Sequence, residues 1–183
     1  MKLFFAALIV ISVLIAQTSY EYVKAPKPVD YVDAKSFSGL WYEIARTDNS
    51  FETNCVGATA QYELTEELEY KVKNRCFDTE FNGDIIEYNG VAKPSDGNIM
   101  SQIDMTYFWI FTKQYRIIYI DKDYTTAVMV DNDMEYVWIM NRKPYMKKQK
   151  LKEVVSFLSN HMDTKELIYT VQHPKGKYAW IKN

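Results

Sequence analysis

The sequence predicts a single all-β domain, an antiparallel sandwich or barrel, followed by one C-terminal α-helix and a final short strand. Three observations predict this fold class. Short apolar runs separated by turn residues recur along the chain between residues 40 and 141. Tyrosine is abundant, with 15 residues against 6 glycines, and aromatic side chains suit a half-buried pleated surface. A helical period appears only after the last of these runs.

The length and composition allow one domain with a sizeable core. The chain has 183 residues, of which 48% are hydrophobic and 15% aromatic, and this composition argues against disorder. The formal charge is −2, so the basic excess typical of nucleic-acid-binding proteins is absent. No His, Cys and Asp cluster has the spacing of metal ligands, and no glycine-rich phosphate loop occurs. The sequence therefore predicts no metal, no cofactor and no nucleic-acid partner.

The first residues are typical of an export signal, which we place at residues 1–19. Lys2 provides the positive charge, and Leu3–Ala16 is an uncharged apolar run that is short for a membrane span. An uncleaved membrane anchor is the alternative. No cysteine follows the run, so we expect an exported protein, periplasmic or secreted, that is not a lipoprotein.

An extended lead-in follows at residues 20–36, where Pro26 and Pro28 predict that no helix runs. The domain itself is expected at residues 37–176. Its eight predicted strands are Leu40–Arg46, Val56–Leu64, Glu69–Phe77, Ile85–Ala92, Ile99–Phe108, Tyr115–Ile120, Thr125–Val130 and Tyr136–Asn141. Turn signals at Asn82-Gly83 and Pro94–Gly97 bound the fourth strand, and a loop is expected near Thr112-Lys113-Gln114.

The pattern changes after the eighth strand. Apolar residues then recur at i, i+3, i+4 and i+7, which predicts one stripe on a helix of about three turns. The residues of this stripe are Leu151, Val154, Val155 and Leu158. A last strand is predicted at Glu166–Val171.

The chain contains two cysteines, Cys55 and Cys76. An even count in an exported chain favours a disulfide, whose loop closure would stabilise the fold by roughly 3 kcal/mol. The alternative is a free thiol that acts as a nucleophile.

Three segments, in order along the chain, resemble the lipocalin family, with the greatest similarity to the bacterial lipocalins and apolipoprotein D. They are Phe37–Arg46 with its Gly-x-Trp, Asp121–Val128, and Tyr136–Arg142. This resemblance implies an eight-stranded antiparallel up-and-down barrel. It also implies that Trp41, after Gly39, lies across the closed end and that Arg142 packs over its ring, where a cation–π contact contributes about 0.5 to 2 kcal/mol. Members with a similar cysteine pair support the disulfide.

Such a barrel encloses room for one small ligand, and alternate residues of each strand point inward. Strand parity predicts that the ligand contacts inward residues, with Ile103 also inside. The predicted binding residues are Glu43, Ala45, Ala58, Ala60, Val72, Asn74, Met105, Tyr115, Ile117, Tyr136, Trp138 and Met140. The three alanines leave volume unfilled, and methionine and aromatic side chains form an adaptable apolar lining. A completely filled barrel is the alternative.

These features predict an exported lipocalin that carries or scavenges a small lipophile, a fatty acid or a lysophospholipid, with Tyr115 donating to its head group. We expect a binding protein and no enzyme. The alternative function is a lipid-modifying enzyme on the same barrel, with a free cysteine thiol as nucleophile. Peripheral association with a membrane, and the choice between monomer and homodimer, are left open by the sequence.

Overall fold

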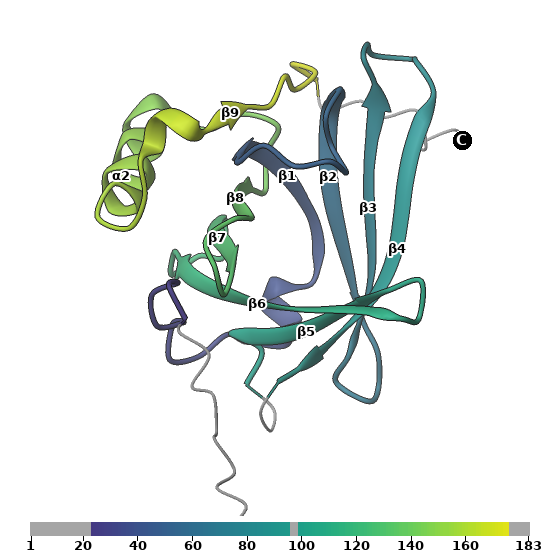
Figure 1. Cartoon of the computed structure of the whole chain (residues 1–183), viewed down its shortest axis with the longest axis vertical. Helices are drawn as coiled ribbons and strands as arrows, with labels where there is room; N and C mark the ends of the chain where they lie inside the picture. Colours follow the sequence, from purple (N-terminus) through teal and green to yellow (C-terminus); the bar gives the residue numbers. More distant parts are fainter. Residues whose placement is uncertain (1–22, 96–98, 176–183) are drawn as a thin grey trace, which may run out of the picture.

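A computed structural model describes residues 23–95 and 99–175, so the predicted signal peptide lies outside the described residues. Eight antiparallel strands close into a barrel, because β1 pairs with both β2 and β8 (Figure 1). The strands are β1 (Gly39–Arg46), β2 (Cys55–Leu64), β3 (Tyr70–Asp78), β4 (Ile85–Pro94), β5 (Gln102–Tyr107), β6 (Phe111–Ile120), β7 (Thr126–Asp131) and β8 (Val137–Asn141). The barrel is confirmed, and the sandwich is not.

One connection differs from the sequence-based prediction. β6 begins at Phe111, so the loop expected near Thr112-Lys113-Gln114 is wrong, and β5 is shorter than expected. The chain turns instead at Phe108–Ile110, where Phe108 and Trp109 adopt φ values of 51° and 63°. Aromatic residues are typical of strands and rarely adopt positive φ, so the pattern concealed this turn.

The lead-in also differs from the prediction at its end. Ala34–Phe37 forms a short helix, α1, so the expectation of no helix before the first strand is wrong. Asp33 caps this helix by accepting a hydrogen bond from the Ser36 N–H at 2.7 Å. The two prolines lie too far upstream to prevent the turn.

A second helix packs on the outside of the barrel. α2 (Lys148–Leu158) lies beside the barrel (Figure 1) and carries the predicted apolar stripe. Its buried Val154 and Leu158 belong to one apolar cluster with Val137 and Ile139 of β8. A 3-10 turn at Thr164–Glu166 shortens the last predicted strand to β9 (Ile168–Tyr169), which pairs with β1. Within residues 23–95 and 99–175, no helix has the length and apolarity to cross a membrane.

The closed end of the barrel is built around Trp41 and Arg142. The guanidinium of Arg142 lies 3.8 Å from the centroid of the fully buried Trp41 ring. Trp41 Nε1 donates to the Phe37 carbonyl at 2.8 Å, so α1 is joined to the same ring. Gly39 has φ +100°, a backbone conformation that favours glycine, and a Cβ there would lie 3.4 Å from Arg142 Nη1.

Arg142 also binds the chain segments that meet beneath the ring. It donates to backbone carbonyl groups on three segments, at 2.8 to 3.2 Å. The acceptors are Ser36, Phe37, Ser38, Leu40 and Tyr124. Burial lowers the pKa of Arg142 to about 10, and the guanidinium therefore stays charged at neutral pH. The cation is thus paired with carbonyl dipoles in place of a carboxylate.

We expect the substitution Arg142→Ala to lower the free energy of unfolding by about 3 kcal/mol or more, because it removes the donor from several partly buried carbonyl groups and removes the cation–π contact. Arg142→Lys should recover only part of this loss, since one ammonium cannot reach carbonyls on three segments. Urea unfolding followed by tryptophan fluorescence measures both changes. Lys27→Ala, which removes an exposed ion pair, is the control. An Arg142→Ala protein as stable as the control would contradict this account of the closed end.

Candidate ligand-binding cavity

The barrel contains a cavity of about 460 Å³, within the range of small-molecule sites. Its deep part is lined by Tyr62, Met105, Met129 and Met140. Below these side chains lies a packed core that includes Trp41 and seals the closed end. The cavity therefore opens at one end of the barrel and is mostly apolar inside.

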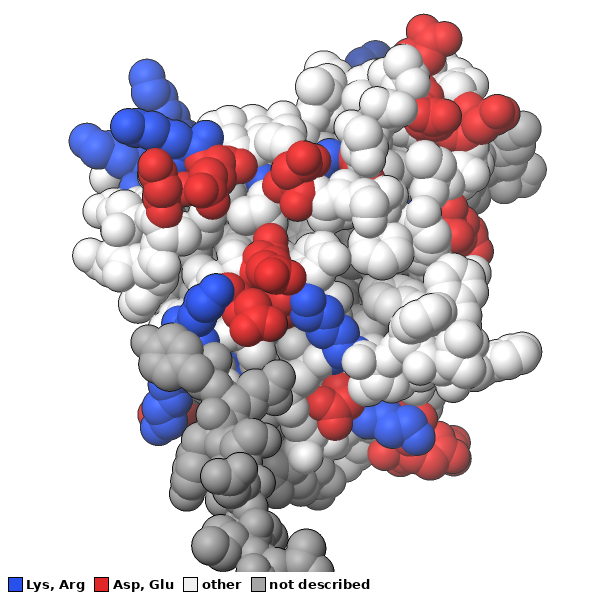
Figure 2. All heavy atoms as spheres, in the orientation of Figure 1, with Lys and Arg blue, Asp and Glu red and all other residues white. Residues whose placement is uncertain are grey.

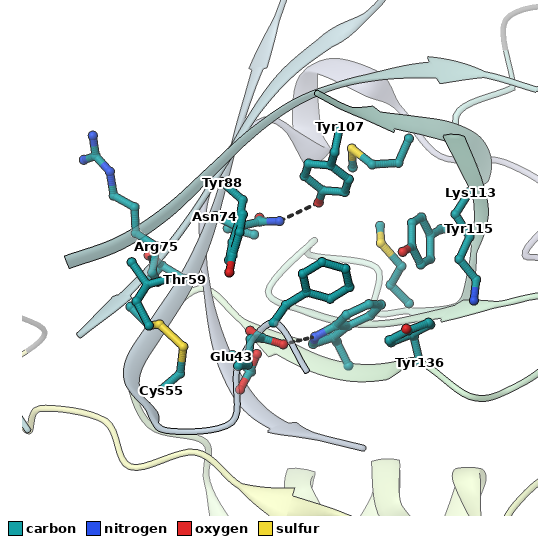
Figure 3. A pocket seen from close by; sticks show the side chains of 18 of the residues that line it. Glu43, Cys55, Thr59, Asn74, Arg75, Tyr88, Tyr107, Lys113, Tyr115 and Tyr136 are labelled. Carbon is teal, nitrogen blue, oxygen red and sulfur yellow. Dashed lines mark hydrogen bonds between the residues drawn. A yellow bond between two sulfur atoms is a disulfide. The ribbon is translucent and has the colours of Figure 1, made fainter. Parts of the chain in front are cut away.

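Most of the predicted binding residues line this cavity. Those that do are Glu43, Ala60, Asn74, Met105, Tyr115, Tyr136, Trp138 and Met140 (Figure 3). Val72 and Ile117 do not line it, nor does Ile103, and all three belong to the core cluster that contains Trp41. Strand parity therefore predicts which side chains point into the barrel, but not whether they lie at the cavity or nearer the closed end.

The inward placement of Ala45 is wrong. The pairing of β1 with β8 shifts by one residue between Glu43 and Ala45, as in a β-bulge. Ala45 then pairs with Ile139 and packs with it in the apolar cluster under α2, outside the barrel. Arg46 takes the inward position instead, opposite Trp138.

The placement of Ala58 in the cavity is wrong for the same reason. The pairing of β2 with β3 shifts between Val56 and Thr59, where Gly57 adopts φ +66°. Ala58 consequently packs against Cys55 and Cys76 rather than lining the cavity.

The two cysteines form the expected disulfide between β2 and β3. Both lie at the wall of the cavity (Figure 3). Because the chain has only these two cysteines, the disulfide leaves no thiol in the structure. The nucleophile that the enzyme alternative requires is therefore absent.

A chain of aromatic rings borders the open end. Phe51 contacts Tyr88 and Tyr136, with ring centroids 5.7 and 6.4 Å apart. Tyr136 stacks on Trp138 at 5.8 Å, and Tyr88 meets Phe108 edge-on at 6.4 Å. These rings give the cavity an apolar mouth whose π faces suit alkyl groups and cations.

A buried polar cluster lies beside the apolar lining. Arg46 Nε lies 3.5 Å from Glu43 Oε1 and 3.7 Å from Glu52 Oε2. Glu52 also accepts hydrogen bonds from Trp138 Nε1 at 3.1 Å and from Asn49 Nδ2 at 2.8 Å. One cation therefore faces two carboxyl groups at the cavity wall.

Glu43 is the more deeply buried of these two carboxyl groups. Burial raises the pKa of Glu43 well above its usual value, and the neighbouring Glu52 raises it further. A hydrogen bond from the Thr170 hydroxyl and the charge of Arg46 act in the opposite direction. Glu43 therefore holds a proton into a pH range where an exposed glutamate has lost it.

The cations that line the cavity are already paired. Arg75 Nε lies 2.5 Å from Glu87 Oε2, and its side chain points away from the cavity (Figure 3). Lys113 Nζ lies 2.6 Å from the buried carboxylate of Asp131 and 4.1 Å from the centroid of the Tyr136 ring. Arg75 and Lys113 are the arginine and lysine among the described lining residues. Because both are paired with carboxylates, the described lining offers no unpaired cation to an anionic head group.

Three carboxylates beside Lys113 lie close enough together to bind a metal ion, but the Lys113 ammonium already lies among them. Carboxylate oxygens of Asp131, Asp133 and Glu135 lie within 4.8 Å of one another. The Lys113 ammonium contacts two of them, at 2.6 Å from Asp131 and 3.9 Å from Glu135. The Lys113 ammonium therefore already neutralises part of the negative charge of this cluster.

Two hydroxyl groups complete the polar contacts inside the barrel. The Asn74 amide donates to the Tyr107 hydroxyl at 2.6 Å (Figure 3). Burial raises the pKa of Tyr107 and of Tyr115, so both phenols stay protonated at neutral pH. Tyr115 packs edge-on against Trp138 at 5.5 Å, with its ring in the cavity wall.

Several lining residues are not among those predicted from the sequence, although some of them carried a signal. Tyr62 and Tyr107 share strand parity with Ala60 and Met105 and could have been included. Phe51 and Glu52 lie on the loop after β1, where no periodic pattern places a side chain. Their positions depend on the tertiary contacts described above.

Comparison with known proteins gives a consistent picture. A family model described as a lipocalin-like domain matches residues 32–173. Outer membrane lipoprotein Blc from Vibrio cholerae is 29% identical over 148 residues, which cover 80% of this chain and 86% of the relative. Apolipoprotein D from Rattus norvegicus is 30% identical over 139 residues, covering 70% and 71%.

The solved structure of insecticyanin from the tobacco hornworm Manduca sexta shares the fold. Its TM-score is 0.68 at 17% identity, with coverage of 85% of this chain and 89% of insecticyanin. At this identity the likeness supports the barrel architecture alone.

The comparisons correct the expected localisation. The missing cysteine after the apolar run led us to expect an exported protein that is not a lipoprotein. The bacterial relatives from Vibrio cholerae, Escherichia coli and Citrobacter freundii are outer membrane lipoproteins, and they point to a lipoprotein. This finding overturns the expectation. The expectation rested on the absence of a cysteine at one position, whereas the similarity to these lipoproteins extends over 80% of the chain.

We expect Glu43→Gln to change how stability depends on pH. The folded state keeps a proton on Glu43 that the unfolded chain releases above its usual pKa of 4.5, so the free energy of unfolding falls as the pH rises from there. A glutamine resembles the protonated carboxyl and cannot ionise. The variant should match the wild type at about pH 4 and exceed it in stability at about pH 8.

Thermal unfolding followed by circular dichroism across this pH range measures the effect. Glu63→Gln, at an exposed position of β2, is the matched control and should leave the profile unchanged. If Glu43→Gln lost stability with rising pH in parallel with the wild type, the buried carboxyl would not hold the proton.

Proposed function

Because this chain belongs to the lipocalin family, whose members bind small hydrophobic ligands, we propose that its barrel binds and carries a lipid with one acyl chain, a lysophospholipid in preference to a free fatty acid. The observation that carries this proposal is the apolar cavity with a ring of aromatic side chains at its single mouth. The family consists largely of binding and transport proteins, and the proposed role of this chain is accordingly binding without catalysis.

The deep part of the cavity suits an alkyl chain. Met105, Met129 and Met140 are flexible and polarisable, so they adapt to a chain of variable shape. About fourteen buried methylenes would contribute about 11 kcal/mol, at about 0.8 kcal/mol each. Association and chain ordering cost several kcal/mol, so a net of about −7 to −8 kcal/mol corresponds to a dissociation constant near 1 μM.

The charges of the cavity favour a head group that is not a bare anion. A fatty-acid carboxylate would face Glu43 and Glu52, while Lys113 and Arg75 are bound to acidic partners. An ammonium or choline group would instead meet the faces of aromatic rings at the mouth. A zwitterionic lysophospholipid combines such a cation with an acyl chain.

The predicted hydrogen bond from Tyr115 becomes part of the same proposal. Its protonated hydroxyl can donate to an ester carbonyl or glycerol oxygen of the bound lipid. The ligand itself is the partner that we propose.

We expect lysophosphatidylcholine to quench or shift the fluorescence of Trp138 and to bind several-fold more tightly than oleate at about pH 8, because the carboxylate of oleate is charged there. Lowering the pH to about 5 should narrow the difference, since both oleate and Glu43, whose pKa is raised by burial, take up protons. Titration of each lipid below its micelle concentration measures the two affinities. Oleate binding that is tighter at about pH 8 would contradict the head-group preference.

We expect Ala60→Phe to weaken lipid binding by about tenfold or more, because a large ring at this position fills part of the cavity. Gln61→Phe is the matched control, since Gln61 is the next residue of β2 and is exposed on the outer face. Equal affinities of the two variants, both with cooperative thermal unfolding, would show that the lipid binds elsewhere.

A further inference from the structure

The hairpin between β5 and β6 exposes four consecutive apolar side chains at the edge of the mouth. Tyr107 pairs with Phe111, so Phe108, Trp109 and Ile110 form the turn. The exposed fractions are 59% for Phe108, 95% for Trp109, 76% for Ile110 and 65% for Phe111. Phe108, Ile110 and Phe111 also line the cavity, whereas Trp109 does not. We name residues 108–111 the aromatic tip.

The backbone of this turn is costly for the residues that occupy it. Phe108 and Trp109 adopt φ values of 51° and 63°, a region that asparagine and glycine enter with little strain and large side chains rarely enter. A turn selected only for stability would carry Asn-Gly or a similar pair. The aromatic tip therefore exposes large apolar side chains to solvent on a strained backbone, which lowers the stability of the fold. This arrangement indicates that the tip contacts another molecule.

The aromatic tip carries no charge. The hairpin that projects beside β4 in Figure 1 appears in Figure 2 as a projection of uncharged atoms. The charged side chain nearest to it in sequence, Lys113, is bound to Asp131. A surface of this kind gains nothing from an oppositely charged partner and gains free energy wherever apolar side chains leave water.

We propose that the aromatic tip inserts into the interface of a lipid bilayer and sets the mouth of the barrel on the membrane surface. Tryptophan at the end of a projecting hairpin fits the boundary between head groups and acyl chains. Since three residues of the tip also line the cavity, an acyl chain can pass from bilayer to cavity along a continuous apolar path.

The geometry favours a bilayer over a second copy of the chain. The tip has three aromatic side chains of roughly 150–250 Å² each and one smaller isoleucine, and both phenylalanines are partly buried, so it presents less than the roughly 800 Å² per partner that stable protein interfaces bury. A convex tip also needs a complementary groove on a protein partner, whereas a bilayer yields to its shape. The inference does not depend on which ligand the cavity holds, so it is tested on protein without added ligand.

The experiment is flotation of the full chain with vesicles of phosphatidylcholine. We expect the wild type to float with the vesicles and Trp109→Ser to partition at least about tenfold less, because its apolar ring no longer enters the interface. Trp109→Phe should retain most of the binding. Tyr31→Ser removes an exposed aromatic residue next to Val32 in the closed-end core, and it should bind as the wild type does.

Two further measurements separate insertion from electrostatic adsorption and from a role in ligand binding. Raising the salt concentration should leave wild-type flotation unchanged, because the tip is uncharged. Flotation that requires anionic lipid and disappears in salt would assign the contact to the lysines of α2 and overturn the proposal. The affinity of Trp109→Ser for a soluble lipid should equal that of the wild type, since Trp109 does not line the cavity.

Other outcomes also decide the matter. A Trp109→Ser protein that floats normally but binds soluble lipid less tightly would make the tip a lid and overturn the proposal. Loss of a wild-type dimer in the variant, measured by light scattering, with normal flotation would make the tip a contact between copies. Reduced flotation with an unchanged oligomeric state and unchanged ligand affinity supports membrane insertion.

Discussion

The barrel depends on the contact between Arg142 and Trp41. This contact joins parts of the chain that are far apart in sequence: α1, the start of β1, the turn before β7 and the end of β8. A guanidinium is suited to this position because its donors spread in a plane and reach several carbonyl groups at once, while its face covers the indole. The interaction closes one end of the barrel, and a cavity with one closed end has only one mouth. The side from which a ligand could reach the cavity follows from that constraint.

Within this frame, the cavity keeps features that a structure selected only for stability would lose. Glu43, Arg46 and Glu52 are ionisable groups with largely buried side chains, and their desolvation opposes folding even where they are paired. A filled core of aliphatic side chains would cost less. The retained volume and the polar cluster lie at the same place, beside Trp138. Local departures from the most stable packing often mark a functional site, and here they coincide with the cavity.

Strand alternation predicted the order of the strands, the late helix and the inner face of the barrel, but it failed where the backbone leaves the regular pleat. Ala45 directly follows a β-bulge and Ala58 lies within one, and an inserted residue puts the two sides of a bulge out of phase in their inward and outward assignments. The second bulge carried a signal, since Gly57 adopts positive φ, and a glycine inside a strand often marks such a site. The first carried none. The turn at Phe108 and Trp109 was hidden because its residues are typical of strands.

The two ends of the barrel divide stability and function between them. At the closed end, polar and aromatic groups satisfy one another, and Trp41 is fully buried. At the open end, aromatic rings remain exposed, and two of them lie on strained backbone. A sealed end cannot exchange ligand, so any exchange with a bilayer must pass the open end. A membrane contact at the aromatic tip would orient the mouth toward the lipid whether or not an anchor also holds the protein at the membrane. An anchor on a flexible segment raises the local concentration of the protein at the surface but leaves its orientation free. The tip adds the orientation, and orientation is what direct transfer of an acyl chain requires.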